Sequence, residues 1–252
     1  MKILLHLSFL GTNYCGYQIQ PNGTTVQQKL NEAAKALFGF DCDIVGCSRT
    51  DSGVHANHFC VCVTEKGKNS LVTTVPTDRI PIAISHFLPD DISVFDAEAV
   101  EEDFHPRYDV KYKEYVYKIW NRQHRDPFLC DRSWHYPKPI DDDRLEKMCR
   151  AARAFVGTHD FAAYMSADSK VRDTVRTVYD AKVERHGDLI EFYVSANGFL
   201  YNMVRIFTGT LISVAEGKIS PEDIEAITVS KDRSRAGITA PAHGLFLNRV
   251  EY

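Results

Sequence analysis

The alternation of apolar and polar positions predicts both strands and helices in the first half of the chain. Thr25 and Gln28 form a capping box, and apolar residues then recur at helical spacing until Gly39. A second helix is predicted at about 77–88. Four segments have the length and pattern of strands: 2–10, 42–47, 59–64 and 92–97. The predicted order is strand, helix, two strands, helix, strand.

The second half repeats this mixture. Strand patterns occur at 108–120, 176–185, 189–196 and 245–252, and helical patterns at 141–155, at 199–216 and from Pro221. Hairpins join several of the strands, and strands and helices do not alternate regularly. Two successive α+β units therefore fit better than a doubly wound parallel sheet. We expect the boundary near residue 105, with an N-terminal unit of residues 1–105 and a C-terminal unit of residues 106–252.

Composition narrows the class of protein. The chain has 252 residues, of which 44% are hydrophobic and 25% charged, so it is too apolar for a disordered protein. Its net charge of −4 excludes a uniformly basic surface. No apolar run approaches the roughly 18 residues of a membrane span, and no cleavage site follows the first strand. We expect a cytoplasmic protein that does not enter a membrane.

The seven cysteines predict neither a disulfide framework nor a metal centre. Their number is odd, and the chain is long enough to fold without disulfides. Four cysteines and two histidines invite a zinc interpretation: Cys42, Cys47, Cys60, Cys62, His55 and His58. However, no C-x-x-C pair occurs, and Cys60 and Cys62 lie in a strand-like run. We expect reduced cysteines in the core of strands and no metal.

Positive charge gathers in the middle of the chain. Residues 104–138 hold eight basic and four acidic side chains, a net charge of +4, interleaved with tyrosine and tryptophan. This mixture can combine phosphate contact with base stacking, although a solvated strand face over an aromatic core has the same composition. Neither G-x-x-x-x-G-K-[ST] nor G-x-G-x-x-G occurs, so no nucleotide cofactor is expected.

The segment 48–55 carries the most specific chemistry. Arg49 and Asp51 are two residues apart, which in extended chain places a guanidinium beside a carboxylate. Such a cation keeps a carboxylate ionised and oriented, and Gly53 permits a tight turn that exposes it. An ionised, exposed carboxylate can act as a nucleophile. The alternative is an ordinary turn in which Asp51 caps the backbone and Arg49 forms a surface ion pair.

The same segment, Arg49-Thr50-Asp51-Ser52-Gly53-Val54-His55, resembles the catalytic loop of the TruA family of tRNA pseudouridine synthases. Further matches to that family follow in order along nearly the whole chain: Gly11-Thr12-x-Tyr14-x-Gly16-Tyr17-Gln18, Thr25-Val26-Gln27, Phe104-His105-x-Arg107, Lys113-x-Tyr115-x-Tyr117, Gly157-Thr158-His159-Asp160-Phe161, Asn197-Gly198-Phe199, Met203-Val204-Arg205 and Ala240-Pro241-Ala242-His243-Gly244-Leu245. Each motif alone is weak. Their common order makes the resemblance specific.

The resemblance implies a fold, an activity and a partner. The fold would be two ferredoxin-like α+β units that share one mixed, mainly antiparallel sheet with a central cleft. The activity would be isomerisation of uridine to pseudouridine in the anticodon stem-loop of tRNA (tRNA positions 38–40), without a metal or cofactor. Such enzymes usually form homodimers, and tRNA would be the partner.

The resemblance also implies roles for residues. Asp51 would be the nucleophile, Tyr115 would stack on the target base, Arg205 would pair with Asp51, and Arg49 would fill the space left by the flipped nucleotide. The residues expected to contact RNA are Arg49, His55, Phe104, His105, Arg107, Tyr108, Lys113 and Lys170. From the residues alone, Tyr115 could equally be a half-buried sheet aromatic, and Arg205 a residue that extends from a helix end to solvent.

Two other functions fit parts of the sequence. Asp51-Ser52-Gly53 matches the D-[ST]-G motif of aspartic peptidases, but that mechanism needs two carboxylates and the motif occurs once. A non-catalytic RNA-binding module would keep the basic, aromatic segment without any chemistry. Loss of activity on replacing Asp51 would separate an enzyme from such a module.

Overall fold

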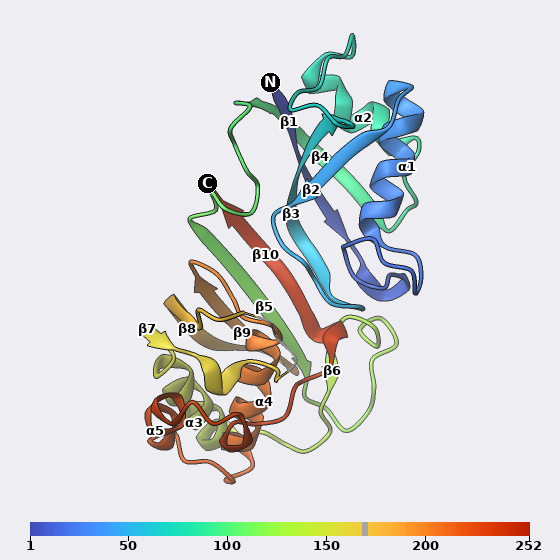
Figure 1. The fold of residues 1–252 in the computed structure, drawn as a ribbon. Coiled ribbons are helices and arrows are strands. Elements are labelled where there is room, and N and C mark those ends of the chain that lie inside the picture. Colours follow the sequence, from blue (N-terminus) through green and yellow to red (C-terminus); the bar gives the residue numbers. More distant parts are fainter. Residues whose placement is uncertain (168–170) are drawn as a thin grey trace. The chain divides into compact units, whose positions relative to one another are not determined.

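The computed structural model describes residues 1–167 and 171–252, so the expected RNA contact Lys170 lies outside the described residues. The chain divides into two compact units, shown in Figure 1. The first comprises Met1–Lys111 and Phe246–Tyr252, and the second comprises Tyr112–Leu245. The sequence places one boundary near residue 105. The last strand belongs to the first unit because it pairs there with an earlier strand.

The first unit is built on a sheet centred on β3 (His55–Glu65). Its other strands are β1 (Lys2–Phe9), β2 (Cys42–Gly46), β4 (Ile92–Val100) and β10 (Leu245–Glu251). β3 pairs antiparallel with β1 and with β2, and β1 pairs antiparallel with β4. β10 runs parallel to the start of β3, with Phe246 opposite His55. The start of β3, which follows the Asp51 segment directly, is thus held by two neighbours.

Helices α1 (Val26–Phe38) and α2 (Ile80–Ser85) lie on one side of this sheet (Figure 1). α1 begins as the capping box predicts, because the Thr25 side chain accepts a hydrogen bond from the backbone N–H of Gln28, and it ends at Gly39. α2 is shorter than predicted, since Thr77–Arg79 forms a 3₁₀ turn. Alternate β1 and β3 side chains pair on one buried face: Leu5 with Val61 and Leu7 with Phe59.

The second unit has a five-stranded sheet in the order β6-β5-β9-β8-β7. Its strands are β5 (Tyr112–Trp120), β6 (Trp134–His135), β7 (Gly157–Asp160), β8 (Val175–His186) and β9 (Leu189–Ala196). Its helices are α3 (Asp142–Arg153), α4 (Met203–Ala215) and α5 (Asp223–Ser230). β6 pairs in parallel with β5, and the pairs of β5 with β9, β9 with β8 and β8 with β7 are antiparallel. Phe155 stacks on Phe207 at 3.9 Å and anchors an aromatic core.

The structure confirms the predicted mixed α+β class, with mainly antiparallel sheets and helices in both units. Besides the shorter α2, the starts of two elements of the second unit differ from the prediction. The strand predicted at 108–120 begins at Tyr112, because the residues before it form turns. The helix predicted at 199–216 begins at Met203, because Asn202 takes a left-handed φ of 62°.

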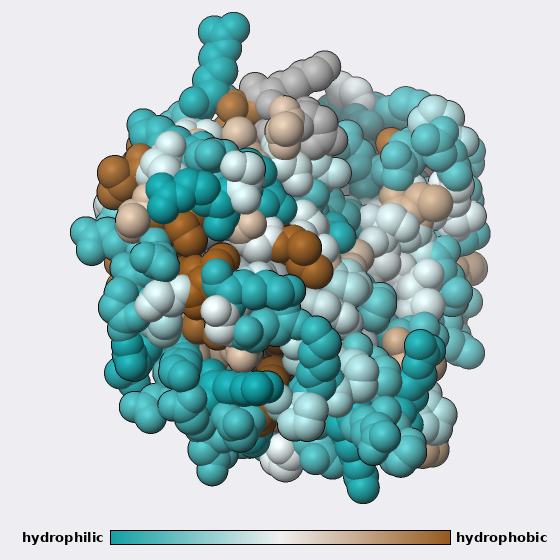
Figure 2. Space-filling view, turned by 90° about the horizontal axis from the view of Figure 1, so that it is seen from below, coloured by the Kyte–Doolittle hydropathy of each residue, from teal (hydrophilic) through white to brown (hydrophobic). Residues whose placement is uncertain are grey.

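The surface shown in Figure 2 is mostly hydrophilic, with hydrophobic residues in small separate groups. Among the described residues, every helix is too short or too polar to cross a bilayer. This agrees with the expectation drawn from the lengths of the apolar runs.

Candidate functional site

Asp51 lies in a tight turn between β2 and β3. The N–H of Val54 donates to the carbonyl oxygen of Asp51 at 3.1 Å, and Gly53 has a φ of 81°. A positive φ at the third position is typical of a type II turn and favours glycine there. Thr50 and Val54 on either side are buried, whereas Asp51 is only half-buried. The turn therefore presents the carboxylate between two anchored residues.

The loop after β1 packs directly on this turn through two glycines. A Cβ on Gly11 would lie 2.0 Å from the carbonyl oxygen of Val54, and one on Gly16 would lie 2.5 Å from that of Thr50. Backbone hydrogen bonds join the loops: Tyr17 N–H donates to Thr50 O at 3.2 Å. The glycines of the first family motif thus allow an approach that any side chain would block.

His55 supports this packing from inside. Its ring is fully buried, its Nδ1 accepts the backbone N–H of Gly11 at 2.9 Å, and it stacks on Phe246 at 4.5 Å. The sequence placed His55 among the RNA-contacting residues. The structure instead places it beneath the two loops, where it can hold them in position.

Arg49 and Arg107 provide positive charge beside the turn. Burial lowers the pKa of Arg107, and the like charge of Arg49 lowers it further. Neither guanidinium forms an ion pair within the described parts of the chain. Tyr17, another neighbour of Arg107, is buried, and its hydroxyl has no hydrogen-bond partner among the described residues. Two guanidinium groups left without carboxylates suit an anionic ligand such as a phosphate.

The predicted RNA-contacting segment 104–108 belongs to the first unit and packs on its two terminal segments. Lys2 Nζ donates to the carbonyl oxygen of Phe104 at 3.0 Å, and the Phe104 ring packs edge-on against Tyr252. His105 stacks on Tyr108 at 4.2 Å, and Tyr108 is 77% exposed. An exposed aromatic ring held by a neighbour is a suitable surface for a nucleobase.

In the second unit, Tyr115 and Tyr117 share one face of β5. Tyr115 is 7% exposed, and its ring meets that of Phe199 edge-to-face at 5.1 Å. Tyr117 is fully buried and donates its hydroxyl hydrogen to the carbonyl oxygen of Pro241 at 2.7 Å. Lys113, on the same face, is 9% exposed, which leaves little of it for RNA. Three family motifs thus meet at this strand.

Arg205 lies in the first turn of α4 and is oriented by two acceptors. Its Nε donates to the carbonyl oxygen of Ala240 at 2.7 Å, and its Nη1 donates to Asn202 Oδ1 at 2.6 Å. Asn202 in turn donates to Ser166 Oγ at 2.8 Å. The guanidinium is therefore fixed within its unit and does not simply extend into solvent. The sequence did not predict this role of Asn202. Its only indication was that Asn202 directly precedes the Met203-Val204-Arg205 motif.

Most of the cysteines are buried, as the sequence predicts. All seven are free, and Cys42, Cys47, Cys60 and Cys62 are buried. Burial raises the pKa of Cys60, and it raises the pKa of Cys62 to about 12. Neither thiol is therefore a ready nucleophile near neutral pH.

Each unit thus contributes a distinct chemical set. The first offers a half-buried turn carboxylate, two guanidinium groups and the stacked pair of His105 and Tyr108, and the second offers a tyrosine pair and an oriented guanidinium. Groups of these kinds can act as a nucleophile, bind phosphates and stack on a base. Comparison with known proteins shows the family to which the chain belongs.

A sequence profile of the family described as tRNA pseudouridine synthase matches residues 7–109 and 151–252. The chain belongs to this family. It is 42% identical over 251 residues to tRNA pseudouridine synthase A of a Thermoanaerobacter species, with 100% of this chain and 99% of the relative covered. The same coverage holds for proteins of that name from Acetivibrio thermocellus (43% over 252 residues) and Caldicellulosiruptor bescii (41% over 251 residues).

A solved structure titled "Crystal Structure of a Cbf5-Nop10-Gar1 Complex" contains a chain that matches 96% of this one, with 57% of that chain covered, at 12% identity and a TM-score of 0.35. A score this low supports no conclusion. The family assignment rests on the sequence match, which extends through the Asp51 segment and, in the relatives, over the full length of this chain.

Proposed function

We propose that the chain is a tRNA pseudouridine synthase that isomerises uridine to pseudouridine in tRNA. The observation that carries this proposal is the family match across the whole chain, which includes the Asp51 turn. In this reaction the bond between N1 of uracil and C1′ of the ribose breaks, the base turns, and a bond from C5 of the base to C1′ replaces it. The hydrogen on C5 leaves to solvent as a proton and N1 takes up a proton, so the product is an isomer of the substrate.

The presence of one turn aspartate is consistent with this chemistry. Glycosidases that cleave a sugar–oxygen bond need a second carboxyl group as acid, because an alkoxide leaves poorly. Uracil can leave as a delocalised anion, so one carboxylate suffices. In our proposal Asp51 is this carboxylate. The peptidase alternative needs two carboxylates and has no support.

The target nucleotide has to leave the RNA stack to react. Flipping costs a few kcal/mol and leaves a gap in the stack. Contacts to the flipped base, and a side chain that fills the gap, must offset this cost. By the resemblance to the TruA family, we assign the stacking face to Tyr115, the partner of the Asp51 carboxylate to Arg205, and the filling of the gap to Arg49. His55 takes a positioning role, because its buried ring supports the loops.

The test is release of tritium from tRNA that contains 5-tritiated uridine. Asp51→Asn keeps the size of the side chain and removes the charged nucleophile, so we expect release to fall by at least about a thousandfold with the melting temperature unchanged. Asp41→Asn is the matched control, because Asp41 pairs with Lys35 on the surface of the same unit. Release that survives in Asp51→Asn would contradict the assignment. Absence of release in the wild type would favour an RNA-binding module.

Three finer points belong to the same proposal. We propose that the modified uridines lie in the anticodon stem-loop, that the enzyme acts as a homodimer and that it works in the cytoplasm, as the resemblance implies. Mapping pseudouridines in tRNA from cells with and without the protein tests the first point. Sedimentation equilibrium tests the second, and fluorescence microscopy of a tagged chain tests the third.

A further inference from the structure

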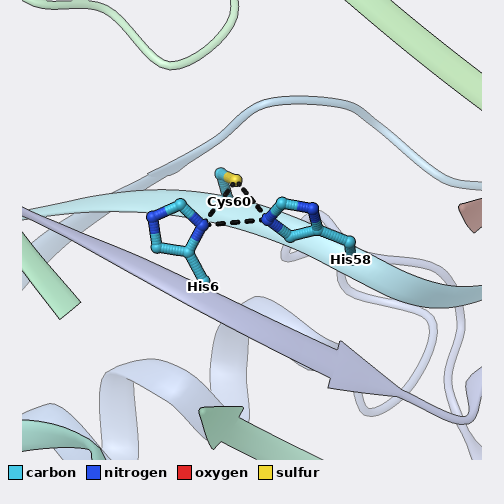
Figure 3. A group of neighbouring side chains, drawn as sticks. All are labelled: His6, His58 and Cys60. Atoms are coloured by element: carbon cyan, nitrogen blue, oxygen red, sulfur yellow. Dashed lines mark hydrogen bonds between the residues drawn. The ribbon is translucent and has the colours of Figure 1, made fainter. Parts of the chain in front are cut away.

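Two histidines and a cysteine meet on the first unit's sheet, outside the Asp51 site. His6 Nδ1 lies 2.9 Å from His58 Nε2, and Cys60 Sγ lies 3.6 Å from His6 Nδ1 and 3.5 Å from His58 Nε2. Figure 3 shows the three side chains converging, His6 from β1 and the other two from β3. All three potential ligand atoms therefore point at one small space.

The register of the sheet creates this cluster. His6 lies directly opposite Cys60 in the antiparallel pair of β1 and β3, and His58 lies two residues before Cys60 on the same face. The register of β1 with β3 shifts beside His58, between Leu7 and Phe9. β-bulges of this kind redirect side chains and are common beside functional sites.

The distances agree with tetrahedral coordination of zinc. With Zn–N near 2.0–2.1 Å and Zn–S near 2.3 Å, tetrahedral geometry separates N from S by about 3.5 Å and N from N by about 3.3 Å. Both observed N–S distances match. The two imidazole nitrogens would have to move apart by only a few tenths of an ångström.

A carboxylate lies beside the ring nitrogen of His6 that does not face the cluster. Histidine zinc ligands usually donate a hydrogen bond from this second nitrogen. Glu98 Oε1, on β4, lies 3.1 Å from His6 Nε2. A proton on Nε2 that is donated to Glu98 leaves the lone pair of Nδ1 free for a metal, and this carboxylate–histidine arrangement is a common feature of zinc sites.

An aromatic ring covers the imidazoles. Phe95 lies opposite a second register shift, between His6 and Leu7 in the pairing of β1 with β4. Its ring centroid lies 5.7 Å from that of His58 and 6.4 Å from that of His6. The His6 side chain is only 15% exposed and Cys60 is buried, so most of the cluster is shielded from bulk water.

We propose that His6, His58 and Cys60 bind a Zn²⁺ ion that cross-links β1 to β3, with solvent as the fourth ligand. On binding, the Cys60 thiol releases its proton to water and the thiolate takes its place beside the metal. β1 leads into the Gly11 loop, and β3 begins at the end of the Asp51 turn, so the ion stabilises the strands that carry both loops. Sequence spacing did not reveal the site, because His6 is 52 residues from His58.

The first experiment measures cobalt binding by the tag-free wild type under reducing conditions. Co²⁺ bound to a thiolate gives a near-ultraviolet charge-transfer band, and we expect this band to saturate at one equivalent and to disappear when Zn²⁺ is added. Zinc should also raise the melting temperature, and a chelator should reverse the increase. A wild type that shows no such band, or binds less than one equivalent, overturns the proposal without any variant.

Variants then assign the ligands. Cys60→Ala should abolish the band, and His6→Gln and His58→Gln should each weaken zinc binding at least tenfold. Cys62→Ala is the matched control, because Cys62 is buried on the same face of β3 two residues further on, and it should bind as the wild type does. If Cys60→Ala keeps the band, or Cys62→Ala loses it, the assignment is wrong.

Glu98→Gln tests the positioning residue. We expect zinc affinity to fall about 10- to 100-fold while the cobalt band keeps its wavelength, because the ligands themselves are unchanged. Unchanged affinity would contradict the role of Glu98. None of these measurements uses tRNA, so they stand apart from the proposed isomerase activity.

Discussion

At the residue scale, the Asp51 turn depends on the absence of side chains at two positions. Gly11 and Gly16 let the loop after β1 lie against the backbone of Thr50 and Val54. The glycines therefore act on the carboxylate indirectly, by fixing the turn that carries it. Periodicity could not predict this contact, because it joins segments about forty residues apart, and only the resemblance drew attention to both segments.

Gly16→Ala tests this contact against a matched glycine. Gly16 and Gly39 both have a φ of 81°, but a Cβ on Gly39 meets no atom within 4 Å. Each substitution should lower the free energy of unfolding by about 1–2 kcal/mol for the left-handed backbone. Gly16→Ala should lower it further and should also reduce tritium release at least tenfold, because Thr50 must move. Equal activity of the two variants would show that the contact does not position Asp51.

Asn202 orients Arg205, and its left-handed backbone allows this role to be tested by substitution with glycine. Glycine accepts the φ of 62° at this position, so Asn202→Gly removes the hydrogen bonds to Arg205 and Ser166 without backbone strain. We expect kcat to fall about tenfold, with a loss of about 1 kcal/mol in stability. Lys231→Gly is the control, because Lys231 is the other non-glycine residue with positive φ among the described residues. It should leave kcat unchanged.

At the scale of elements, the hydrophobic pattern predicted the main helices and most strands and missed the two shortest strands. β6 has two residues and β7 has four, too few for any period to be visible. β3 begins at His55, four residues before its predicted start, because the polar residues His55, Asn57 and His58 hide the strand pattern. Those polar residues form the β10 pairing and the histidine cluster, which only the folded sheet brings together.

The end of α4 carries an acidic residue where a helix dipole disfavours one. Glu216 caps the helix, and its carboxylate accepts hydrogen bonds from Lys138 at 2.6 Å, Lys218 at 2.5 Å and Tyr136 at 2.8 Å. Lys138, then Lys218 and Tyr136, lower the pKa of Glu216 to about 2. The charged form is therefore favoured in the folded protein and joins α4 to the segment after β6.

This linkage predicts a dependence of stability on pH. A lowered pKa stabilises the fold above the ordinary value of 4.5, and the contribution is lost as pH falls toward about 2. Glu216→Gln should cost on the order of 1 kcal/mol at pH 7, since both lysines are exposed, and less at pH 3. Urea unfolding at the two pH values measures this difference. Glu225→Gln, on the exposed side of α5, should show no such dependence. If Glu216→Gln lowers the free energy of unfolding by the same amount at both pH values, the linkage is wrong.

At the scale of the whole molecule, the net charge of −4 conflicts with an RNA substrate only if charge is spread evenly. Residues 104–138, which include Arg107, carry +4, and Arg49 adds a further guanidinium beside the Asp51 turn. Within the described regions, neither Arg49 nor Arg107 has an ion-pair partner. RNA affinity depends on such local clusters, because each phosphate contact releases counterions. Composition showed where the basic segment lies, but the neighbourhood of Arg49 and Arg107 needed the fold.

Salt dependence of tRNA binding tests this distribution. In an inactive Asp51→Asn background, the logarithm of the binding constant should fall steeply with the logarithm of salt concentration. Arg49→Gln and Arg107→Gln should each weaken binding and reduce the magnitude of the slope by about 1, as expected for one lost phosphate contact. Arg79→Gln is the control, because Arg79 is exposed in the same unit and already pairs with Asp78 at 3.4 Å. If tRNA binding by the Asp51→Asn protein does not depend on salt, the cluster does not attract the RNA. If Arg79→Gln changes the slope as much as the other two substitutions do, overall charge and not this cluster attracts it.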